Sequence, residues 1–263
     1  MSHHALVFLL NPTGAEYNGR LGLCASLYDS DDDAFSANHF EAGISAYLSP
    51  IYAVPGVYAQ IAPASFFYLR AEIAAVGIWP LPLAGAGYYE RPGYDADWQS
   101  DDLPASDGGA AHGWSARIRA TFRGQFDLTD EWEFVFSANP WVEVHQLDRP
   151  GYWVDVRDDL ITRRGDWVFA HEGVALFGFV LPGGPSLRFG AFSSLRNVPA
   201  SGYVGHRFGP LAMVSVPWAD AAVEAVDVFI RLGVYTHHRF RAGQVSTMAG
   251  IGVDLDMGGV AGD

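Results

Sequence analysis

Charged side chains recur at every second position in several segments of this sequence, so their spacing places them on one face of each segment. In residues 114–126, Arg117, Arg119 and Arg123 share one face, while Ile118 and Phe122 lie on the other. A repeat of two residues indicates a β-strand, because successive side chains of a strand point to opposite faces. Charges on an interior face are costly unless paired, so these residues are the first candidates for a functional surface.

The same alternation predicts one set of interior charged residues across several strands. The set consists of Arg70, Glu72, Arg117, Arg119, Arg123, Glu133, Glu143, His145, Arg188, Arg196, Asp227, Arg231 and Asp254, with Glu41 and Asp256 in addition. If the strands enclose a narrow lumen, basic side chains that face acidic side chains across it would select small polar or charged solutes. The alternative is a network of ion pairs that only fills the interior. The sequence leaves both interpretations open.

Histidine and serine residues near predicted strand ends could support hydrolytic chemistry. His206, His237 and His238 lie near such ends, and Ser201 and Ser246 fall within a strand or two of them. A serine activated by an adjacent imidazole is a nucleophile for acyl transfer. The sequence does not bring a nucleophile, a base and an orienting group together in one place. The simpler interpretation is that these histidines are interfacial polar residues.

Two acidic clusters could hold Ca²⁺ through carboxylates. They are Asp31, Asp32 and Asp33, and, in a later segment, Asp95, Asp97, Asp101 and Asp102. Neither cluster has the spacing and glycine of a calcium loop, so solvated acidic loops are the expectation. The sequence also lacks zinc-ligand spacing and a phosphate-binding glycine loop. We therefore expect no metal and no cofactor.

A long hairpin over residues 112–147 must position the central charges. Its two arms alternate for longer than strands of soluble proteins usually do, and their length suits a tilted bilayer crossing. Trp114 and Trp132 lie at opposite ends of the apolar face, as expected for rings at two membrane interfaces. A large soluble β-sandwich, with the apolar face as its core, is the alternative.

Similar alternation extends over the whole chain and predicts about twelve strands, with ten or fourteen as the other possibilities. The turns at 127–130, 182–185 and 217–222 fall on one side, and the long connections 80–111 and 148–165 fall on the other. Connections of that length are functional loops or a plug folded into the interior. The segment 167–181 is ambiguous, because either His171 or Glu172 must fall on the apolar side.

Composition excludes several classes of function. The formal net charge is -14, and all 16 basic residues are arginine. An acidic chain is unsuited to nucleic acid, whose phosphates need a basic face. The single cysteine, Cys24, cannot form an intrachain disulfide. No apolar run is long enough for a membrane helix. Met1–His4 does not have the pattern of a secretion signal, so for an exported protein the sequence shown is expected to be the processed form or one engineered for expression.

With these patterns, nearly the whole chain resembles the bacterial outer-membrane β-barrel class, which is porin-like. The resemblance implies an integral outer-membrane protein in contact with the lipid bilayer and with lipopolysaccharide or, when purified, detergent. It does not name a substrate. The chain departs from the class at its end, Met257–Asp263, where such barrels commonly have a terminal aromatic residue.

We therefore expect an all-β protein, an antiparallel up-and-down transmembrane β-barrel formed by residues 1–263 as a single domain. The expected function is a narrow channel, lined by charges, for small polar or charged solutes. The first alternative is a structural or interaction barrel, closed by its charge network or a loop plug, that binds a protein partner through its long loops. A membrane-embedded lipid hydrolase is the third possibility, and the leading expectation is that the chain is not an enzyme.

Overall fold

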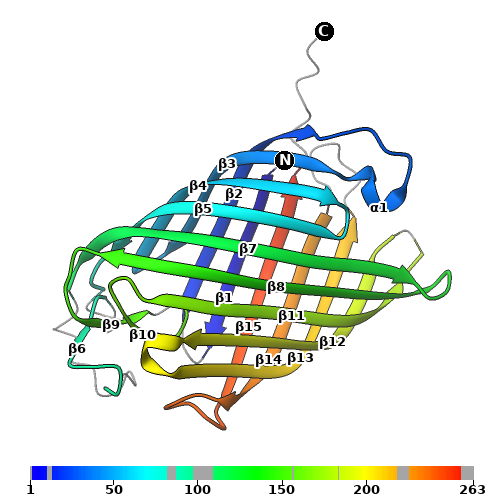
Figure 1. The fold of residues 1–263 in the computed structure, drawn as a ribbon. Helices are drawn as coiled ribbons and strands as arrows, with labels where there is room; N and C mark the ends of the chain where they lie inside the picture. Colours follow the sequence, from blue (N-terminus) through cyan, green and yellow to red (C-terminus); the bar gives the residue numbers. More distant parts are fainter. Residues whose placement is uncertain are drawn as a thin grey trace.

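The chain forms a closed barrel of twelve antiparallel strands in a computed structural model (Figure 1). The structure describes residues 2–10, 14–81, 87–96, 109–155, 157–182, 184–217 and 225–255. Each barrel strand pairs with its neighbours in sequence, and the first and last strands pair with each other. The prediction of an all-β, up-and-down, twelve-stranded barrel is confirmed.

The barrel strands alternate in direction along the chain. Their bounds are β1 (Ser2–Leu10), β2 (Gly14–Ser26), β3 (His39–Ser49), β4 (Tyr52–Ala64), β5 (Phe67–Ile78), β7 (Ala111–Asp127), β8 (Trp132–Leu147), β11 (Trp167–Val180), β12 (Ser186–Val198), β13 (Tyr203–Pro217), β14 (Ala225–His237) and β15 (Val245–Leu255). The hairpin β7–β8 is the longest, with strands of 17 and 16 residues.

The apolar face of each strand points outward. Ile118 is 53% exposed, whereas its neighbour Arg117 is 5% exposed and lies inside. The two residues pair across the hairpin with Val142 and Glu143 respectively, so the register puts apolar residues together outside and opposite charges together inside. Alternation had shown that the two faces differ, and the closed structure shows which is which.

Large apolar side chains cover the outer wall of the barrel. They include Phe8, Leu23, Ile44, Val57, Ile73, Trp114, Phe122, Trp167, Phe169, Phe189, Phe208, Ile230 and Val245, each at least 44% exposed. A closed barrel satisfies every backbone group between its strands, so it can present such a surface to hydrocarbon. Among the described helices, none has the length and apolar character to cross a bilayer.

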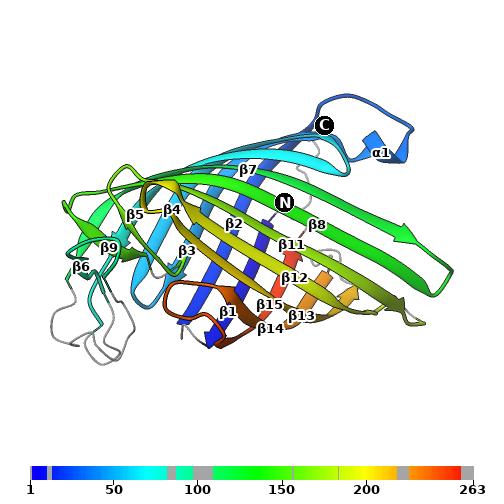
Figure 2. The ribbon, with the colours of Figure 1, turned by 60° about the horizontal axis from the view of Figure 1, so that its bottom comes forward.

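The two long connections meet beyond one rim of the barrel and form a small sheet of their own (Figure 2). Strand β6 (Glu90–Arg91) comes from the first connection, and β9 (Tyr152–Asp155) and β10 (Leu160–Arg163) come from the second. Both β6 and β10 pair with β9. The short turn 128–131 and the described residues of the turn after β11 (181, 182, 184 and 185) lie at the opposite rim. This rim also carries the connection 27–38 with helix α1 (Asp33–Ser36). Trp218 and the rest of 218–224 lie outside the described residues.

Apolar side chains fix the second connection to the barrel. Trp153 is 1% exposed and packs with Leu147 and Val76 of the wall. Leu160 is fully buried and packs with Val198 at the end of β12. Burying side chains of this size stabilises the packed state by about 1.5 to 3 kcal/mol each. The second connection is therefore an ordered part of the barrel mouth.

The structure shows which side chains of β11, β13 and β14 point outward at two places where the sequence pattern is irregular. In β11, Glu172 points into the barrel toward Arg196, and His171 lies on the outer wall beside Gly173. Between β13 and β14 the register shifts at His206, which leaves Thr236 without a directly opposed residue. This β-bulge makes Thr236 and His237 exposed in succession.

Candidate functional site

A cavity of about 420 Å³ occupies the interior of the barrel. Among the described residues, eight arginines line it but only three carboxylates do. The arginines are Arg20, Arg70, Arg117, Arg119, Arg157, Arg196, Arg207 and Arg231, and the carboxylates are Glu16, Asp158 and Glu172. An acidic protein therefore encloses a basic interior, and the low-dielectric wall strengthens the field there.

Four of these arginines have no carboxylate partner in the described part of the chain. The guanidinium group of Arg70 donates to the side-chain oxygen of Gln60 and lies 4.9 Å from the ring centroid of Tyr58. Arg207 lies over the ring of Tyr235. Arg119 and Arg20 complete the group of four, and the Nε atom of Arg119 is buried without a hydrogen-bond partner. These cations are available to an anion that enters the cavity.

Trp141 forms an aromatic wall of the cavity. Its ring centroid lies 4.4 Å from the guanidinium carbon of Arg196, 5.1 Å from that of Arg119 and 5.9 Å from that of Arg117. The ring holds three arginines from two strands, β7 and β12, through cation–π contacts. Trp141 is not among the residues predicted from the sequence, although its odd position beside Asn139 and Glu143 places it on the inner face.

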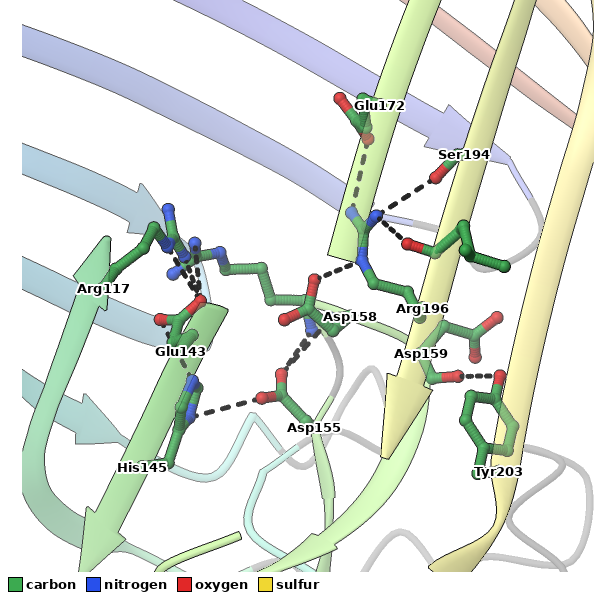
Figure 3. Close-up of polar contacts among 12 residues, drawn as sticks. Arg117, Glu143, His145, Asp155, Asp158, Asp159, Glu172, Ser194, Arg196 and Tyr203 are labelled. Atoms are coloured by element: carbon green, nitrogen blue, oxygen red, sulfur yellow. Dashed lines mark hydrogen bonds and ion pairs between the residues drawn. The ribbon is translucent and has the colours of Figure 1, made fainter. Parts of the chain in front are cut away.

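Near the long-loop rim, the charges are paired in a continuous chain (Figure 3). Arg117 donates to Glu143 at 2.8 and 2.5 Å. His145 lies 3.0 Å from the other oxygen of Glu143 and 3.4 Å from a carboxylate oxygen of Asp155. Arg117, Glu143 and His145 are predicted site residues, and Asp155 comes from the second long connection. The second long connection thus supplies Asp155, a second carboxylate partner for His145 beside Glu143 of the barrel strand.

A second ion pair joins the same loop to β12. Arg196 donates to Asp158 at 2.8 Å and also contacts Glu172 at 3.3 Å (Figure 3). Burial raises the pKa of Asp158, but Arg196 and Arg117 outweigh it and hold that pKa below its usual value. Asp158 is therefore ionised at neutral pH and holds the loop against the inner wall.

Asp155 responds differently to the same surroundings. Burial, together with the nearby Asp158 and Glu143, raises its pKa from 3.8 to about 6, and His145 only partly opposes the shift. An acid whose pKa lies this high gains a proton within the mildly acidic range. The loop therefore contains one firmly charged carboxylate and one that titrates.

Asp159 fixes the loop to the opposite part of the barrel. Its carboxylate accepts from Tyr235 at 2.8 Å and from Arg241 at 3.2 Å, and it lies 3.4 Å from His238. Its backbone oxygen accepts from Tyr203 at 3.1 Å. The positive φ of 55° at Asp159 shows that these contacts hold an uncommon backbone conformation. His238, considered as a hydrolytic residue from the sequence, is a buried partner of this loop.

The remaining predicted site residues fall into separate groups. Glu133 and Arg188 form a buried ion pair at 2.6 Å near the short-turn rim. Glu72 accepts from Ser45 at 2.8 Å. Arg231 lies 4.0 Å from Glu172, at the cavity. Five predicted residues do not belong to these pairs. Glu41 accepts from Tyr58 and Gln60, and Arg123 is exposed at the short-turn rim, where it donates to Ser65. Asp227 is half-buried, and the side chain of Asp254 lies outside the described residues, as does Asp256.

The geometry of one group would suit a metal ion by distance alone. Ligand atoms of Glu143, His145 and Asp158 lie within 4.8 Å of one another. Both carboxylates already accept hydrogen bonds from guanidinium groups, which supply the compensating positive charge. We therefore treat this group as part of the ion-pair chain. Of the acidic clusters, Asp31, Asp32 and Asp33 are exposed, Asp95 pairs with Arg239, and Asp97, Asp101 and Asp102 lie outside the described residues.

No protein-family model matches the sequence, and no curated protein matches it. Solved structures with a similar arrangement include the NanC porin in a rhombohedral crystal form, at 8% sequence identity, with 98% of this chain and 100% of that chain covered and a TM-score of 0.41. The KdgM porin is similar at 6% identity, with 97% and 99% covered and a TM-score of 0.39.

Proposed function

We propose that residues 1–263 act as a single transmembrane barrel domain that forms a narrow channel for small anionic solutes in the bacterial outer membrane. The observation that carries the proposal is the cavity wall, where eight arginines face three carboxylates. Fixed cations in a confined space attract anions and repel cations. The apolar outer wall supports the lipid bilayer, with its lipopolysaccharide, as the surrounding medium.

The loop at the barrel mouth supports the idea of a narrow, selective passage. Arg157 and Asp158 of the second connection reach the cavity, so the loop takes up part of the bore. Twelve strands lie between the filled barrels of eight strands and the open channels of sixteen. A solute would therefore pass in contact with side chains, where the unpaired arginines act at short range.

The test is the ion selectivity of the refolded protein in a planar lipid bilayer under a KCl gradient. The expected result is discrete conductance steps with a preference for chloride. Arg119→Glu should shift the reversal potential toward potassium selectivity, because it inverts a charge inside the cavity. Arg123→Glu is the matched control, since Arg123 is exposed at the short-turn rim, outside the cavity, and should change selectivity less.

The second candidate function is a closed barrel that presents its long loops to a protein partner. The ion pairs of Asp155, Asp158 and Asp159 favour it, because they fix the loop across the mouth. Stable insertion without conductance would support this function and contradict the channel. Conductance that is unaffected by Arg119→Glu would contradict the selective cavity.

A further inference from the structure

Three side chains on the outer wall, near the long-loop rim, form a hydrogen-bonded chain. The Oγ atom of Ser193 lies 3.0 Å from Nε2 of His206, and Nδ1 of His206 lies 2.5 Å from Oγ1 of Thr236. Thr236 also donates to the backbone oxygen of His206 at 3.4 Å. Its hydroxyl proton is thus engaged, so it accepts from Nδ1–H. That tautomer leaves Nε2 free to accept the proton of Ser193.

Each member of the chain comes from a different strand. Ser193 is in β12, His206 in β13 and Thr236 in β14, and the bulge between β13 and β14 lies at this point. Bulges commonly re-aim side chains beside active sites. Here the bulge places the Thr236 hydroxyl against the imidazole. A nucleophile, a base and an orienting group therefore meet in one place.

The surroundings of this chain are apolar. Phe208 stands opposite Ser193 in the register and is 50% exposed, and Leu195 stands opposite His206. Gly173 is the other neighbour of Ser193, and a Cβ atom there would lie 3.0 Å from Cε1 of His171. His171 therefore lies over Gly173, on the far side of Ser193 from His206. Ionisable groups on a membrane-facing wall are costly, and they mark functional sites more often than structural ones.

We infer that Ser193 and His206 form a serine esterase site that hydrolyses the acyl esters of membrane lipids. Oγ of Ser193 bonds to the ester carbonyl carbon as its proton passes to Nε2 of His206. The bond from that carbon to the alcohol oxygen then breaks, and the alcohol leaves with the proton from His206. An acyl ester of Ser193 remains.

Water completes the reaction. It gives a proton to Nε2 of His206 while its oxygen attacks the acyl carbon, and the bond from that carbon to Oγ breaks. Oγ of Ser193 recovers its proton from His206. One ester and one water thus yield one fatty acid and one alcohol. The site lies on the apolar outer wall near the long-loop rim, where this reaction requires lipid acyl esters to reach it.

Thr236 is a positioning residue in this scheme, because it acts only through His206. Thr236→Val keeps the shape of the side chain and removes the hydroxyl that holds Nδ1–H. It should lower kcat about 10-fold or more and alter the pH profile of kcat, since general-base catalysis contributes about 10²- to 10⁴-fold. Thr236→Ser should restore both, a rescue that a purely structural role would not predict.

The experiment measures fatty-acid release by the refolded full-length protein in mixed micelles. One arm contains phosphatidylethanolamine, and the other contains lipopolysaccharide with ester-linked acyl chains. Ser193→Ala should lower release at least about 100-fold. Ser201→Ala is the matched control and should retain release, because the Ser201 hydroxyl bonds only backbone groups of the adjacent turn: it donates to the oxygen of Val198 and accepts from the N–H of Tyr203.

Heat-modifiable migration and unchanged bilayer conductance show that Ser193→Ala is folded, independently of the esterase reaction. A fluorophosphonate should add one label to the wild type, at Ser193. Release in one arm alone supports the proposal and identifies the lipid source. Absence of both release and label in the folded wild type would overturn the site, as would full activity of Ser193→Ala.

Discussion

The arginines in the barrel interior fall into two groups, which differ in whether a carboxylate pairs with them. Among the arginines that line the cavity, Arg20, Arg70, Arg119 and Arg207 have no carboxylate partner in the described part of the chain. At the loop end, Arg117 and Arg196 are held by Glu143 and Asp158. Both sets of arginines come from barrel strands, but Asp158 comes from the connection 148–166. The part of the barrel wall that lines the cavity is therefore basic, and Asp158 of the loop neutralises one of its arginines, Arg196.

The largest effect is expected where the pairing is most buried. Glu143→Gln removes the partner of Arg117 and His145, and Glu143 is 1% exposed. Removing one member of a buried ion pair costs about 3 to 5 kcal/mol, because the other charge stays buried without compensation. Urea unfolding in detergent should show this loss. A free energy of unfolding within about 1 kcal/mol of the wild type would contradict the assigned pairing.

A smaller, local effect is expected at the loop. Asp158→Asn removes the ion pair with Arg196 while the barrel strands keep their own contacts. The loop should be held less firmly, so trypsin should cleave after Arg157 about 10-fold faster or more, since a loss of 1.4 kcal/mol opens the loop tenfold more often. Asp31→Asn, at an exposed acid, is the control. Equal cleavage rates in both variants would show that the ion pair does not hold the loop.

The stability of the loop end should depend on pH through the titration of Asp155. Its pKa is raised to about 6 in the folded protein, from 3.8. The folded state therefore binds more protons than the unfolded state between these values, and stability falls as pH rises from about 4 to 6. Hydrogen exchange of residues 152–155 measures this trend. Asp155→Asn should flatten it, and an unchanged trend in that variant would assign the titration to another group.

The smallest effect on stability is expected at the cavity. Arg20→Gln removes a charge that has no carboxylate partner in the described residues, so the free energy of unfolding should change by less than about 1 kcal/mol. Chloride selectivity should nevertheless decrease in the bilayer measurement. A large loss of stability would show that Arg20 is a structural residue, and would remove the contrast between the two ends.

Much of the fold could be predicted because the barrel repeats one simple pattern. Alternation in residues 114–126 and 132–144 gave the two faces of the β7–β8 hairpin, and the same pattern gave the twelve strands. The bore charges could be predicted where the alternation is unbroken, as at Arg117, Arg119 and Glu143. The interior charges could not be predicted where the alternation is broken. Arg207 lies in residues 203–217, where polar and apolar side chains do not alternate regularly in the sequence, and Asp155 and Asp158 belong to a connection with no periodic pattern.

The hydrolytic residues show the same limit. His206 was identified as a candidate near a strand end, but Ser193 was not considered beside it. These residues are 13 positions apart, and their contact depends on the pairing of β12 with β13. Thr236 reaches His206 only through a bulge, which leaves no mark in the alternation.

The sequence by itself determined that two chemically different faces exist and which residues share each one, because the side-chain period of a strand is a local property. Tertiary structure decided which face is outward, which charges meet, and that the loop carboxylates reach Arg196 and His145. Closure of the barrel and the register of its strands set those distances. Residues far apart in the sequence become neighbours only through this closure and register.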